Sequence, residues 1–200
     1  MKKRTLSSSG RRVVVTGMGL VTPLGNDVES TWAGLLEGRS GAGRITHFDP
    51  SKLDVNFACE VKNFEPTQYI NKKDLRRMDR FIQLGVSAAL QAIQQSGLDI
   101  NNTPAEAIGV SLSSGIGGLP MIEETHNDFL TGGPRKISPF FIPSTIINMI
   151  AGNLSIMYGM KGPNLSVVTA CSTGLHAIGL SARMIEYGDA DVMVCGGAEG

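Results

Sequence analysis

Short apolar segments rich in β-branched residues alternate along this chain with longer amphipathic segments that end at glycine. The apolar segments have the length and composition of buried strands, and they lie at 13–16, 108–112, 165–169 and 192–195. A helix between two strands returns the chain to the same edge of a sheet, so such strands pair in parallel and are covered by helices. The sequence therefore predicts an α/β fold.

The segments between these strands carry apolar residues at helical spacing. They predict helices at about 27–37, 71–96, 121–130, 145–157 and 174–187. Residues 39–66 and 137–143 show no such periodicity, and prolines interrupt the second of them. We expect both to be irregular.

Composition excludes several classes of protein. The 200 residues are 42% hydrophobic, which is enough for a soluble chain with a core, and 18 basic residues balance 18 acidic ones. A neutral chain has no general attraction to nucleic acid or to an anionic membrane, so we expect neither as a partner. No apolar run approaches the roughly 20 residues of a membrane-spanning helix.

The cysteines and the N-terminus indicate a cytoplasmic protein. Three cysteines without a Cys-x-x-Cys pair give no zinc or redox motif, and we expect no metal and no other cofactor. The basic start is not followed by the apolar stretch of a secretion signal. We therefore expect residues 1–10 to be a flexible tail and 11–200 to form the folded unit.

Two glycine-rich turns resemble nucleotide-binding loops but lack the residues that define them. The turn at 17–19 is followed by Thr22 where a dinucleotide fingerprint has its third glycine. The turn at 113–118 lacks the Gly-Lys-Ser/Thr ending of a phosphate-binding loop. Both are expected to be ordinary turns between a strand and a helix.

Cys171 is the candidate nucleophile, because it lies between a predicted strand and the start of a predicted helix. Such a turn exposes one side chain on a sharp bend, and the helix N-terminus stabilises a thiolate or an oxyanion there. The alternative is a small buried residue without a catalytic role. That alternative fits Cys59 and Cys195 better.

None of the three histidines is well placed to assist Cys171. His176 follows it by five residues, and on a helix that spacing points the ring about 140° away. We expect His176 to be packed or at an interface. His47 and His126 have no accompanying motif, and we expect both to be solvated.

Basic side chains form a stripe with i, i+3, i+4, i+7 spacing on the predicted helix at 71–96, and a second basic pair follows it along the chain. The stripe consists of Lys73, Arg76, Arg77 and Arg80, and the pair of Arg135 and Lys136. Two interpretations remain open. The residues form a solvated helix face, or they dock an acidic partner.

Several motifs together resemble a known family. Thr-Ala-Cys-Ser-Thr-Gly at 169–174 and the segment Gly-Pro-Arg-Lys-Ile-Ser-Pro-Phe-Phe-Ile-Pro-Ser-Thr-Ile-Ile-Asn-Met at 133–149 resemble condensing enzymes of fatty-acid synthesis, and most closely the β-ketoacyl-acyl-carrier-protein synthases of type II. The segments at 13–19, 114–119 and 188–194 are similar to the same family. The resemblance runs from about residue 11 to residue 200.

The resemblance implies a thiolase-like fold with α-β-α-β-α layers in the complete enzyme, a homodimer, of which this chain covers mainly the N-terminal βαβ half. In that family the motif cysteine takes an acyl chain from acyl carrier protein as a thioester. Malonyl-loaded carrier protein then loses carbon dioxide, and its carbanion attacks the thioester. The product is a β-ketoacyl chain two carbons longer.

By position in these motifs, Cys171 would be the nucleophile, Ile116 the gating residue of the acyl pocket and Phe141 a wall of that pocket. The resemblance also favours docking over solvation for the basic residues. Those that would meet the acidic carrier protein are Lys73, Arg76, Arg77, Arg135 and Lys136.

The family's two catalytic histidines and a supporting lysine belong to its second half. We therefore expect residues 1–200 alone to be inactive. Two alternatives to a condensing enzyme stay open. One is a catalytically silent relative of the chain-length factors, although these typically lack the motif cysteine; the other is a non-catalytic half that pairs with another subunit in a heterodimer.

Overall fold

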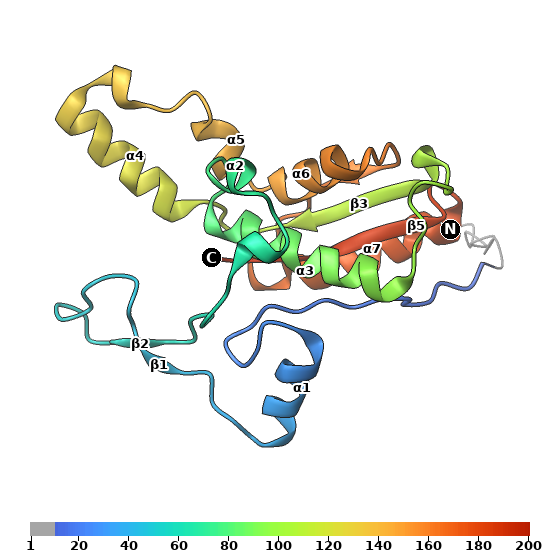
Figure 1. Ribbon diagram of the computed structural model, residues 1–200, viewed down its shortest axis with the longest axis horizontal. Coiled ribbons are helices and arrows are strands. Elements are labelled where there is room, and N and C mark those ends of the chain that lie inside the picture. The colour runs from blue at the N-terminus through green and yellow to red at the C-terminus, as the bar shows by residue number, and fades with distance from the viewer. Residues whose placement is uncertain (1–10) are drawn as a thin grey trace, which may run out of the picture.

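A three-stranded parallel sheet forms the centre of the computed structural model, which describes residues 11–200 (Figure 1). Its order is β4 (Asn164–Leu165), β3 (Ile108–Ser113) and β5 (Val192–Gly197). β3 and β5 pair along their whole length, and both pairings are parallel. The predicted α/β class and parallel pairing are confirmed, although β4 is shorter than the strand expected at 165–169.

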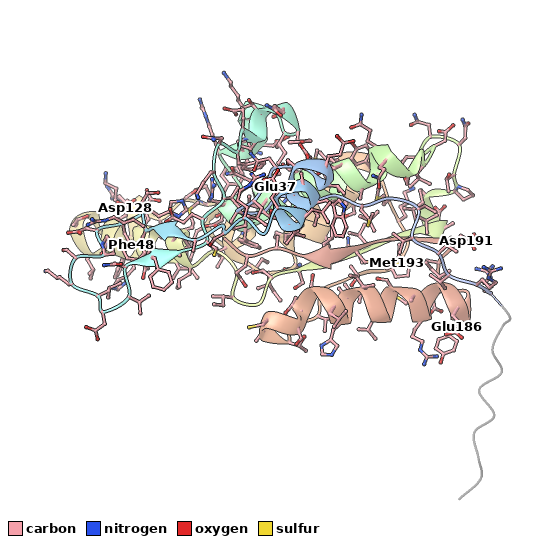
Figure 2. The ribbon with its side chains drawn as sticks, turned by 90° about the horizontal axis from the view of Figure 1, so that it is seen from below. Glu37, Phe48, Asp128, Glu186, Asp191 and Met193 are labelled. Carbon is pink, nitrogen blue, oxygen red and sulfur yellow. The ribbon has the colours of Figure 1, made fainter. Side chains whose placement is uncertain are left out.

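Helices cover both faces of this sheet. α3 (Arg80–Ser96) and α6 (Met149–Tyr158) pack together on one face, and α7 (Thr173–Tyr187) packs on the other, as Figure 2 shows. All six residues of β3 are buried, because it is the central strand. The main core lies between α3, α6 and the sheet and includes Phe81, Ile82, Val86, Val110, Leu112, Ile150 and Leu154.

The strand predicted at 13–16 is wrong. No strand includes these residues, and the valines at 13, 14 and 15 are 39%, 64% and 77% exposed. A strand requires a neighbour with which to exchange backbone hydrogen bonds, and no described strand pairs with this segment. The segment instead follows α3, where the backbone N–H groups of Met18 and Leu20 donate to the side chains of Gln95 and Gln91.

The single helix predicted at 71–96 is divided in two. α2 (Lys72–Leu75) is one short turn, and α3 begins only at Arg80. Asp79 causes the division, because its backbone is extended and its carboxylate accepts a hydrogen bond from the N–H of Phe81. α3 ends as predicted at Gly97, which has the left-handed backbone (φ 66°) that closes many helices.

α4 (Leu119–Gly132) extends away from the sheet in Figure 1 and buries none of its residues. A 3₁₀ turn at Pro134–Lys136 and the short helix α5 (Phe141–Thr145) bring the chain back. α5 lies where an irregular segment and the start of the next helix were expected, so α6 begins at Met149 rather than near 145.

The N-terminal third lies mostly to one side of the sheet (Figure 1). α1 (Val28–Leu36) matches the predicted first helix, and Asp27 caps it. Residues 39–66 are largely irregular, as expected, and contain only the two-residue antiparallel strands β1 (Gly43–Arg44) and β2 (Phe57–Ala58). Two further 3₁₀ turns lie at Pro66–Gln68 and Ala105–Ala107.

Within residues 11–200, no helix combines the length and the apolar character needed to cross a lipid bilayer.

Candidate active site

Cys171 lies in a 3₁₀ turn, Ala170–Ser172, directly before the first residue of α7. Ala170 has a left-handed backbone (φ 51°), which is one of only two such values among the non-glycine residues at 11–200. A side chain at this conformation costs energy, and such strain is common where a turn must present a reactive group. The Cys171 side chain is exposed, as the predicted turn requires.

Thr169 joins the strained turn to the first turns of α7. Its backbone N–H donates to the hydroxyl of Thr173 at 3.0 Å, and its own hydroxyl lies 2.6 Å from Nδ1 of His176. The carbonyl of Thr169 accepts from the N–H of Ser172. His176 is exposed and bonded to Thr169, so the expectation that it is packed is wrong, and the alternative of a place at an interface stays a prediction.

Two glycines allow α7 to approach the sheet at backbone distance. A Cβ atom at Gly174 would lie 3.2 Å from the backbone nitrogen of Gly197, and one at Gly197 would lie 3.0 Å from the Cα of Gly174. The first turn of α7 therefore rests directly on the carboxyl end of β5. This contact places Cys171 at the edge of the sheet where β3 also ends.

A cavity of about 510 Å³ opens beside Cys171. Its lining comes from the loop after β3, from the turn and first residues of α7, and from the end of β5. The lining residues are Ser113, Gly115, Ile116, Ala170, Cys171, Thr173, Gly174, Leu175, Gly197, Ala198 and Glu199.

The cavity brings together two of the predicted site residues and leaves out the third. Ile116 and Cys171 both line it, although 55 positions separate them in the sequence. Phe141 does not line it; this residue begins α5, and its carbonyl accepts from the hydroxyls of Ser144 and Thr145. The role of Phe141 as a pocket wall stays a prediction.

Glu199 is the residue of this site that sequence reasoning missed. Its carboxylate accepts hydrogen bonds from the hydroxyl of Ser114 at 2.6 Å and from the N–H groups of Gly115 and Ile116 at 3.0 and 3.2 Å. A signal was present, because an acidic residue just beyond the carboxyl end of a parallel strand lies at the edge where such sheets bind ligands. Only the fold shows that the loop after β3 is its partner.

The predicted basic stripe does not exist as one helix face. Lys73 lies on α2, whereas Arg76 and Arg77 lie in the turn before α3. Arg80 turns away, with its guanidinium 5.8 Å from the ring of Phe64 and 3.5 Å from the carbonyl of Val61. The proposed stripe at i, i+3, i+4, i+7 is therefore wrong.

One contact links the turn before α3 to the segment after α4. The Arg77 guanidinium lies 4.1 Å from the centre of the Phe140 ring, which is a cation–π contact. Arg135 and Lys136 are exposed at the start of that segment, beyond the end of α4. We call the exposed basic residues of these regions and of α2 the basic surface; they are Lys73, Arg76, Arg77, Arg135 and Lys136.

The other cysteines differ from Cys171 and from each other. Cys195 lies partly buried in β5, and burial raises the pKa of its thiol. Cys59 is exposed, so its expected burial is wrong. All three thiols are free.

His47 and His126 are exposed, as predicted. No cluster of three or more histidine, cysteine, aspartate or glutamate side chains in the described part of the chain is arranged to hold a metal ion.

Known proteins resemble this chain in both sequence and structure. Residues 10–200 match the family model described as Beta-ketoacyl synthase, N-terminal domain. The chain is 59% identical to 3-oxoacyl-[acyl-carrier-protein] synthase 2 of Vibrio cholerae over 191 residues, which are 96% of this chain and 46% of that protein. It thus spans about half the length of the curated relatives it matches.

Two solved ketosynthase structures share the fold. "The ishigamide ketosynthase/chain length factor" superposes with a TM-score of 0.85 at 33% identity, covering 95% of this chain and 48% of that one. A type II PKS acyl-carrier protein in complex with its ketosynthase gives 0.81 at 26% identity, covering 95% and 51%. The predicted thiolase-like fold is confirmed, and the chain belongs to the β-ketoacyl synthase family, as an N-terminal domain of that family.

Proposed function

We propose that this chain is the nucleophile-bearing half of a 3-oxoacyl-[acyl-carrier-protein] synthase that elongates fatty acids. The observation that carries the proposal is the position of Cys171, which projects from a strained turn at the start of α7 into a cavity that Ile116 also lines. A thiol placed in this way can accept an acyl group while the hydrocarbon part of that group occupies the cavity. The 59% identity to a synthase of this name supports the same activity.

The first chemical step is thioester exchange at Cys171. The Cys171 sulfur attacks the carbonyl carbon of the acyl thioester, the bond from that carbon to the carrier sulfur breaks, and the carrier sulfur leaves as a thiol with the proton that the Cys171 thiol gives up. The N-terminus of α7, where the helix dipole is positive, lies next to Cys171. The acyl chain is then held covalently.

The second step forms the carbon–carbon bond. The malonyl thioester loses carbon dioxide, and the resulting carbanion attacks the carbonyl of the acyl group on Cys171. The carbon–sulfur bond to the enzyme breaks, so the thiolate is regenerated and a β-ketoacyl chain two carbons longer leaves. None of the histidines at 47, 126 and 176 lines the cavity beside Cys171, so we assign the role of assisting decarboxylation to the second half of the family.

Acyl carrier protein is the proposed partner, and the basic surface is its proposed docking site. One structural relative is an acyl-carrier protein in complex with its ketosynthase. Five exposed basic side chains, on α2, in the turn before α3 and after α4, fit an acidic partner by charge. We also propose that the protein works in the cytoplasm, where thiols stay reduced, and that it forms a homodimer.

A non-catalytic partner in a heterodimer is the second candidate, since one structural relative is a ketosynthase/chain length factor pair. The free thiol on the strained turn favours a catalytic chain instead, because a silent subunit has no need for a reactive cysteine there.

The test uses the full-length enzyme, by which we mean residues 1–200 followed by a C-terminal ketoacyl synthase half, such as that of the Vibrio cholerae relative. The enzyme is incubated with palmitoyl-loaded carrier protein, and intact-mass and peptide spectra are recorded. We expect one palmitoyl adduct on Cys171 and none in the Cys171→Ser variant, whose hydroxyl lacks an activating base. An adduct on another residue, or no adduct, would contradict the proposed function.

A further inference from the structure

The carboxylate of Glu199 holds the loop that carries Ile116. One oxygen accepts from the hydroxyl of Ser114, and the other accepts from the consecutive N–H groups of Gly115 and Ile116. All three partners are hydrogen-bond donors, and an ionised carboxylate can only accept, so no two donors or two acceptors face each other here. Hydrogen bonds to a charged group are also stronger than those between neutral groups.

The loop is tied internally by the same hydroxyl. Ser114 is 1% exposed, and its oxygen donates to Glu199 while accepting from the N–H of Gly117 at 2.8 Å. The far end of the loop is held separately, because the N–H of Gly118 donates to the carbonyl of Thr145. Glu199 therefore anchors the end of the loop that lies toward the cavity.

This end of the loop also touches the turn that carries Cys171. A Cβ atom at Gly115 would lie 3.0 Å from Oε2 of Glu199 and 3.2 Å from the carbonyl oxygen of Ala170. The Ile116 side chain itself is 67% exposed, so little packing fixes its position. Its place beside the cavity depends mainly on the backbone of the loop, and the Glu199 carboxylate binds that backbone at Ile116.

We propose that Glu199 is a positioning residue that sets where Ile116 stands over the cavity, and thereby the length of acyl chain that Cys171 accepts. The inference rests on the proposed function, because it assigns the cavity to the acyl chain. An amide in place of the carboxylate has one accepting oxygen and an NH₂ group that would face a donor. The loop would lose part of its anchor, Ile116 would move away more readily, and longer chains would enter more easily.

The test compares Glu199→Gln with the unaltered full-length enzyme. The measurement is kcat/KM for hexanoyl and palmitoyl thioesters of acyl carrier protein. We expect the ratio of palmitoyl to hexanoyl activity to rise about tenfold, the change that corresponds to one lost hydrogen bond to a charged group. Glu106→Gln is the matched control, because Glu106 is an exposed glutamate before the opposite end of β3, and it should leave the ratio unchanged.

A double-mutant cycle separates positioning from general damage. In an Ile116→Ala background there is no branched side chain to position, so adding Glu199→Gln should no longer alter the ratio. Ser114→Ala removes one of the three donors and also the acceptor for the N–H of Gly117, so it should shift the ratio in the same direction. This second variant also keeps the test decisive if Glu199→Gln does not fold.

Two results would overturn the inference while leaving the proposed function in place. One is an unchanged ratio in Glu199→Gln, which includes an equal loss of activity with both chain lengths. The other is a shift that persists in the Ile116→Ala background. A different result, failure of the unaltered enzyme to form any acyl adduct on Cys171, would overturn the proposed function and this inference with it.

Discussion

At the scale of single residues, the chemistry of this chain depends on where each thiol lies. Cys171 lies in the strained turn directly before α7, a 15-residue helix. Cys59 is exposed and directly follows β2, and Cys195 is partly buried in β5. Only Cys171 combines exposure with a position directly before a helix. At Cys195 burial raises the pKa of the thiol.

The three thiols should therefore react with iodoacetamide in a definite order. We expect Cys171 to be alkylated first, Cys59 later and Cys195 last, because a raised pKa leaves less thiolate at neutral pH. Limited alkylation of the full-length enzyme followed by peptide mapping measures the order. Modification of Cys59 before Cys171 would show that the helix N-terminus does not activate the proposed nucleophile.

At the scale of elements, one buried carboxylate orders the start of two helices. Asp79 is 5% exposed; one oxygen accepts from the N–H of Phe81 in α3, and the other accepts from the N–H of Met121 in α4. The first N–H groups of a helix have no partner inside the helix, and here the Asp79 side chain supplies one for each helix. Asp79 thus fixes α4 relative to α3, and the loop that carries Ile116 lies immediately before α4.

Asp79→Ala should destabilise the full-length enzyme by about 2 kcal/mol, because it removes two caps from a buried position. Asp27→Ala is the matched comparison: Asp27 caps α1 alone, through the N–H of Ser30, and we expect a loss of about 1 kcal/mol. Urea unfolding measures both. Equal losses in the two variants would show that the bond to α4 contributes nothing.

The basic surface is also an element-scale feature, because it joins the turn before α3 to the segment after α4 through Arg77 and Phe140. Reversing the charge at Arg76 and Arg77 should weaken the binding of acyl carrier protein about tenfold or more, and added salt should weaken binding by the unaltered enzyme. Turnover of a small acyl thioester should not change. Equal carrier-protein affinity in the variant and the unaltered enzyme would remove this surface from docking.

At the scale of the whole molecule, the described chain leaves much apolar surface open. Val15, Ile156 and Leu175 are 77%, 76% and 73% exposed, and they come from the N-terminal segment, α6 and α7. Both outer strands of the sheet have a neighbour on one side only. Exposed apolar patches and open sheet edges favour association with another surface.

Residues 1–200 expressed alone should therefore aggregate or associate, and should not elongate acyl chains. The chemical reason is that no histidine lines the cavity beside Cys171 to act as an acid, a base or an oxyanion donor. The loss of such a group typically lowers the rate by about 10²-fold or more. Size-exclusion chromatography and an elongation assay, run beside the full-length enzyme, check both statements. A monodisperse monomer that elongates acyl chains would contradict the assignment of catalytic roles to a second half.

The sequence by itself determined the order of the central elements and the nucleophile. Buried strands and glycine-ended helices are encoded by local periodicity, so β3, β5 and α7 were predicted within a few residues of their bounds. Cys171 was predicted because a turn between a strand and a helix is a local feature. The separate location of the basic residues was missed, since a helix cap at Asp79 overrides an otherwise continuous helical pattern.

Only the tertiary structure decided which distant segments meet. The apolar run at 13–16 has the composition of a strand, but a strand forms only beside a hydrogen-bonding neighbour, and this segment lies along α3 instead. Glu199 holds the loop at Ile116 because parallel pairing of β3 and β5 ends the two strands side by side, at Ser113 and Gly197. Contacts of this kind depend on which strands become neighbours in the sheet, and the neighbours here come from segments far apart in the sequence.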